Sequence, residues 1–275
     1  MTSSLLDSFL HYSFLQNALL AGLLVAAIGG VLGVFLVLRG MSLLGDGLAH
    51  LSFAGIALGL VAGILPIGTA FAVSIAGAIA IHLMRERQIV KSDTAIGIIF
   101  TAGLAVGVLL VSFSRSLVNV QSYLFGSIVA TSRDDLVLTA VLGAALLALL
   151  ALFYREFVSM TFSEEAARVS GLPVAFLNLL FVTLTAAAIV MAARVTGVLL
   201  VSALLIIPAA TALQLRRGFH ATLAWSVAFG LTSVVAGLGI SVQYDLAPGA
   251  TIAITDVALF AVIGIGAALV TRRAA

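Results

Sequence analysis

Residues 16–38 read Gln16-Asn-Ala-Leu-Leu-Ala-Gly-Leu-Leu-Val-Ala-Ala-Ile-Gly-Gly-Val-Leu-Gly-Val-Phe-Leu-Val-Leu38 and contain no charged side chain. An apolar run of about 20 residues is long enough to cross the hydrocarbon core of a bilayer as an α-helix. This stretch therefore predicts a membrane-spanning helix near the start of the chain. Similar runs recur through the rest of the sequence, separated by charged residues and turn residues.

The composition of the whole chain also indicates a membrane protein. Of its 275 residues, 63% are hydrophobic and 9% are charged, and the mean hydropathy is +1.28. Soluble domains carry about 25% charged residues, so a soluble globular domain is excluded. The length allows roughly eight to ten spans and no sizeable aqueous domain, so residues 1–275 are expected to form one membrane domain. The net charge of +2 gives no reason to expect a nucleic-acid partner.

The apolar runs predict an all-α polytopic membrane protein with about nine spans. An odd number of spans places the two termini on opposite sides of the membrane. With the N-terminus outside and the C-terminus inside, three of the 13 basic residues lie outside and the other ten inside, as the positive-inside rule requires. The expected spans cover residues 16–38, 48–64, 67–84, 94–112, 135–153, 172–192, 196–214, 220–241 and 249–270.

One outer connection is unusually apolar. Residues 117–130 are too short to span the membrane and too hydrophobic for a free loop. We expect this stretch to lie in the membrane interface or to dip into it.

The longest inner connection, residues 154–171, carries the signals of a short helix. Ser163 can cap the N-terminus of such a helix, and Glu164 and Glu165 suit its first turn. Gly171 is a typical helix stop. These residues predict a short helix near 163–171 on the cytoplasmic face, and a capped surface turn without further function is the alternative.

Asp46 and His50 are the ionisable residues that most need an explanation. They lie four apart in Gly45-Asp-Gly-Leu-Ala-His-Leu51, a spacing that puts both side chains on one face of a helix, one turn apart. Ionisable groups at membrane depth cost about 2.5–3.5 kcal/mol each and tend to mark ion pathways. We interpret the pair as a transit site for a cation. The alternative is that each side chain is hydrogen-bonded to a neighbouring helix.

The residues after His50 predict two different helix faces. Gly55, Gly59 and Gly63 recur every four residues, a spacing typical of close helix packing. At about 100° per residue, this face lies opposite to Asp46 and His50. The stripe that continues from His50 is therefore expected to be free of helix packing and to line a pathway. It consists of Phe53, Ala54, Ala57 and Val61.

The ligand types favour zinc or manganese as the cation. Carboxylate oxygen and neutral imidazole suit both metals, and the absence of cysteine from the sequence excludes thiolate ligands. Two ligands are too few for a complete site, so a second copy of the chain or water must supply the others. Incomplete ligation suits a conduit, because an ion held too strongly would not leave.

Other polar or kink-forming residues rank lower. Asp256 lies near the middle of the last expected span, with Thr251 and Thr255 as candidate hydrogen-bond partners, and is the second-rank pathway residue. Pro208 frees a backbone carbonyl and is expected to kink or break the seventh span, as scaffold or as hinge. Three histidines at the ends of expected spans are explained by interface positions, namely His11, His82 and His220.

Four blocks of sequence together resemble the membrane permeases of bacterial ATP-binding-cassette (ABC) importers for zinc and manganese. The most specific are the Gly-Asp-x-x-x-His block around Asp46 and the block Leu204-Leu-Ile-Ile-Pro-Ala-Ala-Thr211. The other two are Ser122-Tyr-Leu-Phe-Gly126 and Tyr244-Asp245 before Pro248-Gly249, and all four run in family order over nearly the whole chain. Asp256 departs from the family pattern, so no role is carried over to it.

The resemblance implies a homodimeric permease in the bacterial inner membrane. It implies two cytoplasmic ATPase subunits that bind ATP, and an extracytoplasmic metal-binding protein, as partners. It implies that Asp46 and His50 are the metal-transit residues. No cofactor is expected in this chain, and the metal is cargo. The imidazole and the block Leu51-Ser-Phe-Ala-Gly55 favour zinc as that cargo, ahead of manganese and iron.

The resemblance also implies that the segment near 163–171 is the coupling helix, which contacts the ATPase. The residues assigned to this role are Ser163, Glu164, Glu165, Arg168 and Gly171.

The chain itself is not expected to be an enzyme. Its one lysine, Lys91, lacks the glycines of a phosphate-binding loop, so ATP hydrolysis is assigned to the partner ATPase. ATP-driven motion of that partner would reorient the two permeases between outward-open and inward-open states. A proton-coupled secondary transporter that moves metal without an ATPase is the main alternative. A membrane-embedded hydrolase using Ser52 near His50 ranks last, because no complete set of nucleophile, base and orienting residue is visible.

Overall fold

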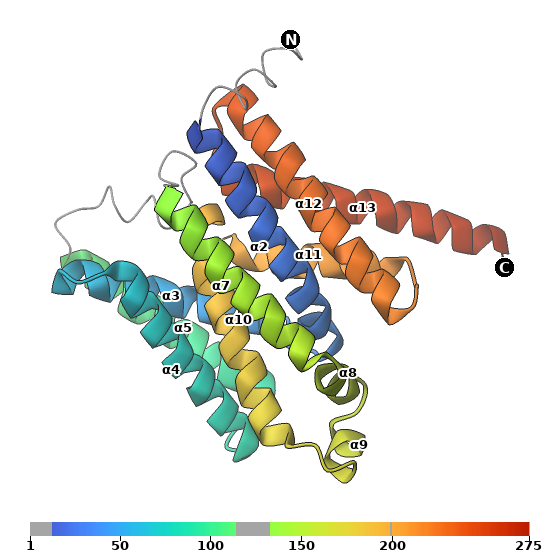
Figure 1. Ribbon diagram of the computed structural model, residues 1–275, viewed down its shortest axis with the longest axis horizontal. Helices are drawn as coiled ribbons and strands as arrows, with labels where there is room; N and C mark the ends of the chain where they lie inside the picture. The colour runs from blue at the N-terminus through green and yellow to red at the C-terminus, as the bar shows by residue number, and fades with distance from the viewer. Residues whose placement is uncertain (1–12, 114–132, 199, 275) are drawn as a thin grey trace.

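The structure is a computed structural model of the chain and describes residues 13–113, 133–198 and 200–274 (Figure 1). All regular elements in these residues are α-helices, so the expected all-α fold is confirmed. The helices in chain order are α2 (Ser13–Leu38), α3 (Leu43–Ala62), α4 (Pro66–Glu86), α5 (Ser92–Phe113), α7 (Arg133–Leu152), α8 (Tyr154–Phe162), α9 (Glu164–Val169), α10 (Val174–Thr196), α11 (Val201–Gln214), α12 (Phe219–Tyr244) and α13 (Pro248–Ala274).

The described part of the chain has seven helices that are long and apolar enough to cross a membrane, so it is a polytopic membrane protein. Helices α7 and α8 form a pair bent by 64°, which would be an eighth span if it crosses as one unit. The expectation of about nine spans is corrected to seven or eight for these residues. The seven helices are α2, α3, α4, α5, α10, α12 and α13.

The seventh expected span, residues 196–214, is the one that the structure breaks up. Helix α10 continues to Thr196, Gly197 follows with a φ of +84°, and α11 begins only at Val201. The 14 residues of α11 extend about 21 Å, less than the roughly 30 Å of a hydrocarbon core. Pro208 lies inside α11 without breaking it. The apolar segment expected at 117–130 lies outside the described residues.

The helices pack as two groups joined by α10. Helix α3 packs against α4 and α5, and α2 packs against α11 and α12. Helix α10 contacts α2, α3 and α4, and so lies between the two groups (Figure 1). Helices α8 and α9 lie at the end of the molecule opposite to the start of α2 (Figure 1). One hydrophobic core runs through both groups, since buried side chains of α2, α3, α10 and α11 belong to a single cluster.

Residues 39–42 form a tight corner between α2 and α3. Gly40 has a φ of +64°, a left-handed conformation that glycine adopts without steric cost. The Met41 amide donates to the Leu36 carbonyl at 2.8 Å, and the Arg39 amide donates to the Phe35 carbonyl at 3.0 Å. These bonds hold the α2–α3 corner against the last turn of α2 and so fix where α3 begins.

Aromatic rings cluster around Phe35, next to the α2–α3 corner. Phe35 of α2 makes edge contacts with Tyr154 and Phe157 of α8, Phe181 of α10 and Phe219 of α12, with ring centroids 5.5–6.5 Å apart. Such pairs add about 0.5–1.5 kcal/mol each beyond the area that they bury. This aromatic cluster joins the end of α2 to α8, α10 and α12.

Candidate metal-transit site and coupling segment

Asp46 and His50 lie on the side of α3 that the chain leaves partly uncovered. Asp46 is in the first turn of the helix and His50 one turn later, near enough for the carboxylate to act electrostatically on the imidazole. Both side chains are partly exposed, whereas residues 47–49 between them are buried. Leu43, on the same face, is 55% exposed. The side chains of Asp46 and His50 are therefore accessible at the surface of a single copy of the chain.

The surroundings of His50 leave it with unused ligand capacity. Its ring meets Phe100 of α5 edge-to-face, with centroids 4.4 Å apart and planes at 80°. Its Nδ1 is buried and has no hydrogen-bond partner in the described part of the chain. No group of three or more histidine, aspartate or glutamate side chains in that part could hold a metal ion. One chain thus supplies an acid and an imidazole but not a complete site.

The glycine face of α3 packs against α4. A β-carbon on Gly55 would lie 2.6 Å from the Cα of Ala70, and one on Gly59 would lie 2.6 Å from the Cα of Pro66. The expected packing role is confirmed for these two glycines. It is wrong for Gly63, which has open space around it and ends α3 in the left-handed conformation, with a φ of +68°.

From His50 onward, the opposite face of α3 packs against α5, a contact not expected from the sequence, whereas the first turn with Leu43 and Asp46 stays partly uncovered. A β-carbon on Gly103 would lie 2.9 Å from the amide nitrogen of Leu51, and one on Gly107 would lie 2.5 Å from the ring of Phe53. The spacing Gly103-x-x-x-Gly107 was the available signal for this contact. Helix α3 is therefore clamped between α4 and α5, which fixes the backbone of His50.

The stripe beyond His50 is not free in the way that the sequence suggested. Phe53, Ala54 and Ala57 are buried within the chain, whereas Val61 is 44% exposed. Phe53 and Ala54 are covered because α5 approaches closely at Gly107, so the expectation of an unpacked stripe is wrong for them. Whether these four residues line a metal pathway stays a prediction.

Helix α9 has the local chemistry that the sequence indicated. The Ser163 hydroxyl accepts a hydrogen bond from the Ala166 amide at 3.1 Å, which is the expected N-cap. The two glutamates occupy the first turn, and Gly171 follows the helix with a φ of +82°. Because α9 has only six residues, this cap and its packing must hold it in place.

The two sides of α9 differ in their contacts. Glu164 faces the rest of the chain, where its Oε1 accepts a hydrogen bond from Arg39 Nη2 at 2.8 Å. Ala167, on the same side, is fully buried. Glu165 and Arg168 are exposed. Val169 is 90% exposed, and Phe162 just before α9 is 69% exposed.

The remaining ionisable candidates have different surroundings. Asp256 of α13 is 1% exposed, and neither of its oxygens has a hydrogen bond of normal geometry to a described atom. The expected partners of Asp256 are wrong, because Thr255 donates to the Thr251 carbonyl and Thr251 to the Pro248 carbonyl. His82 lies 3.1 Å from the Glu86 carboxylate at the end of α4. His11 lies outside the described residues.

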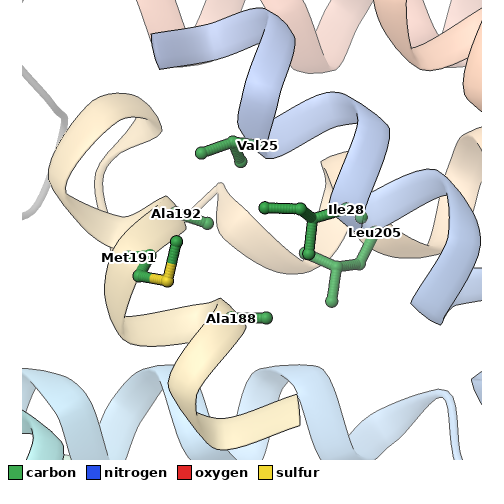
Figure 2. Close-up of a pocket in the computed structure, with 7 residues that line it drawn as sticks. Val25, Ile28, Ala188, Met191, Ala192 and Leu205 are labelled. Carbon is green, nitrogen blue, oxygen red and sulfur yellow. The ribbon is translucent and has the colours of Figure 1, made fainter. Parts of the chain in front are cut away.

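A pocket between α2, α10 and α11 is unsuited to a metal ion. Figure 2 shows Val25 and Ile28 of α2 facing Ala188, Ala192 and Met191 of α10 across a gap that Leu205 of α11 closes. All the lining groups are apolar, and the gap is narrower than a water molecule. A hydrated cation would lose its ligands here without replacement.

The fold defines a polytopic helical membrane protein, and one face of α3 carries an acid–imidazole pair. The chain belongs to the ABC 3 transport family, which matches residues 11–267. It is a permease subunit of a bacterial ABC importer for divalent metals, a multi-pass membrane protein that has no catalytic role of its own.

Three similar proteins support this assignment. The manganese transport system membrane protein MntC of Listeria monocytogenes is 36% identical over 255 residues, covering 93% of this chain and 91% of the relative. The probable iron transport system membrane protein of Haemophilus influenzae is 35% identical and covers 92% and 93%. The structure of PsaBC from Streptococcus pneumoniae in complex with Fab matches with a TM-score of 0.87 at 34% identity, covering 96% and 95% of the two chains.

Proposed function

We propose that two copies of this chain form the membrane pathway for manganese, with Asp46 and His50 of each copy at the transit site. The observation that carries this proposal is the partly uncovered face of α3, on which the acid and the imidazole lie one turn apart. A two-fold axis facing this surface would bring two carboxylates and two imidazoles together. The face would then be covered by the second copy and not by lipid.

The choice of manganese rests on the relatives and on the ligands. Relatives are named for manganese and iron transport, so the expectation of zinc is replaced here by manganese, with iron as the second candidate. Carboxylate and water ligands suit manganese, and two aspartates with two histidines leave room for water in a six-coordinate shell. Zinc binds such ligands more tightly than manganese does, and we expect it to compete.

We also propose that α9 contacts an ATPase subunit, one for each permease, and that a metal-binding protein docks on the opposite side. Helix α9 lies at the end of the molecule away from the start of α2 (Figure 1). With α9 in the cytoplasm, the N-terminus is outside, in agreement with the distribution of basic residues. The exposed Phe162 and Val169 would become buried against the ATPase.

Uptake of radioactive manganese into proteoliposomes tests this function. The complete complex should import manganese when ATP is present, and the permease alone should not. Uptake by the permease alone would favour the secondary transporter instead.

Substitutions in the same assay test the transit site. Asp46→Ala and His50→Ala should each lower uptake by at least about 10- to 100-fold. Loss of a residue that only supports a metal ligand already lowers metal affinity or activity by this factor. Asp93→Ala and His220→Ala remove exposed side chains of the same types and should leave uptake unchanged. Full uptake by both transit-site variants would refute the site.

A further inference from the structure

Arg39 joins three elements at the α2–α3 corner. Its side chain is 4% exposed, and its Nη2 donates hydrogen bonds to Glu164 of α9 and to the side-chain oxygen of Asn178 of α10. The guanidinium carbon lies 4.8 Å from the centroid of the Phe181 ring, within range of a cation–π contact. A single guanidinium therefore connects the corner to both helices that flank residues 170–173.

The Arg39–Glu164 contact is hard to release. Burial lowers the pKa of Arg39 from its ordinary value, and the hydrogen bond to Glu164 opposes that shift. Arg39 is 4% exposed whereas Glu164 is 42% exposed. Breaking the pair therefore leaves the buried guanidinium with only Asn178 and the Phe181 ring as partners among the described residues, which is unfavourable. Arg85 of α4 adds a second tie, because its Nη1 contacts the Met41 sulfur at 3.4 Å. The corner should therefore follow α9 when α9 moves.

The same corner sets the start of the helix that carries Asp46. Arg39 lies four residues before Leu43, where α3 begins, and Asp46 is in the first turn. Backbone hydrogen bonds from Arg39 and Met41 to the last turn of α2 hold residues 39–42 in one conformation. The Arg39 guanidinium therefore keeps a nearly fixed position relative to the first turn of α3. A displacement of α9 is thus passed through Arg39 to the metal-binding end of α3.

We propose that the Arg39–Glu164 ion pair is the positioning contact that couples the ATPase-facing helix α9 to the transit residue Asp46. This inference rests on the proposed function. It divides the two glutamates, since Glu164 is the internal tie and the exposed Glu165 is available to a partner. Arg39 and Glu164 transmit motion and do not themselves bind metal.

The test is the number of manganese ions imported per ATP hydrolysed by the complete complex in proteoliposomes. Glu164→Gln should lower this ratio by at least about fivefold, the lower end of typical coupling factors, while the ATPase still co-purifies. Arg39→Gln should have the same effect, and the double variant should be no worse than either single variant, because the pair acts as one unit. Asp93→Asn removes an exposed carboxylate and should leave the ratio unchanged.

Several outcomes would overturn this inference. A wild-type ratio in Glu164→Gln would do so, as would loss of ATPase co-purification in that variant, because it would place Glu164 in the docking surface. If Glu164→Gln fails to fold, Arg39→Lys serves instead, since it keeps the charge but removes the planar guanidinium that contacts Glu164, Asn178 and the Phe181 ring at once. A wild-type ratio in Arg39→Lys would then refute the coupling. A wild-type complex that imports no manganese would refute the proposed function itself.

Discussion

A substitution at Gly103 of α5 can shift the backbone of His50 without changing any charge. In Gly103→Ala, the new β-carbon would lie 2.9 Å from the Leu51 nitrogen and 3.1 Å and 3.2 Å from the His50 carbonyl carbon and oxygen. Comfortable contacts between carbon atoms are about 3.5–4.0 Å, so α3 and α5 must separate by roughly 0.5–1 Å. The atoms in the way are backbone atoms, which cannot rotate aside. Manganese uptake should therefore fall, because the His50 backbone shifts.

The size of the effect follows from a matched substitution on the same helix. Gly97 of α5 has open space where its β-carbon would be, so Gly97→Ala only gains helix propensity, about 1 kcal/mol. Gly103→Ala gains the same amount but incurs about 1–3 kcal/mol of overpacking. The difference in stability between the two variants should therefore be about 1–3 kcal/mol in favour of Gly97→Ala.

Two measurements on the purified complex check this prediction. Thermal unfolding in detergent should rank Gly97→Ala above Gly103→Ala, and manganese uptake in proteoliposomes should fall for Gly103→Ala only. Equal melting temperatures and equal uptake for the two variants would show that α5 does not hold His50 in place.

Three further predictions address the dimer, the docking surface and the buried acid. Leu43→Cys, on the uncovered face of α3, should cross-link two copies of a chain that has no native cysteine, and Ala102→Cys on the outer face of α5 should not. Cross-linking only at position 102 would place the two-fold axis elsewhere. Val169→Asp should weaken ATPase co-purification by at least about tenfold, since burying a valine contributes about 1.5–3 kcal/mol, and should leave the melting temperature unchanged. Asp256→Asn should raise the melting temperature, because a buried carboxylate with no ion-pair partner among the described residues is destabilising, and a lower melting temperature would show that the neighbouring Ser233 stabilises the carboxyl group.

The features that could be predicted from sequence depend on neighbours along the chain. The four-residue spacing of Asp46 and His50 fixes their common face on any helix. The Ser163 cap is likewise a contact between residues three apart, and the structure has it. The packing of Gly55 and Gly59 followed from small residues at helical spacing, although the spacing did not say that α4 would be the partner.

The features that could not be predicted depend on residues far apart in the chain. Phe53 and Ala54 are covered because Gly107 lets α5 approach, and no pattern within α3 reports that contact. Glu164 points inward because it pairs with the buried Arg39, which lies 125 residues earlier in the chain. The sequence pattern of α9 gave no reason to distinguish Glu164 from Glu165. The number of spans was overestimated because hydropathy counted residues 196–200 into the seventh span, whereas α11 begins only at Val201 and is too short to cross the membrane.

Anomalous X-ray diffraction at the manganese absorption edge, from crystals of the complete importer soaked with manganese, tests the central claim most directly. A manganese peak on the two-fold axis, between the Asp46 carboxylates and His50 imidazoles of both copies, is the predicted result. A single membrane-embedded peak away from these four side chains, with α3 of each copy facing lipid, would contradict the proposed transit site.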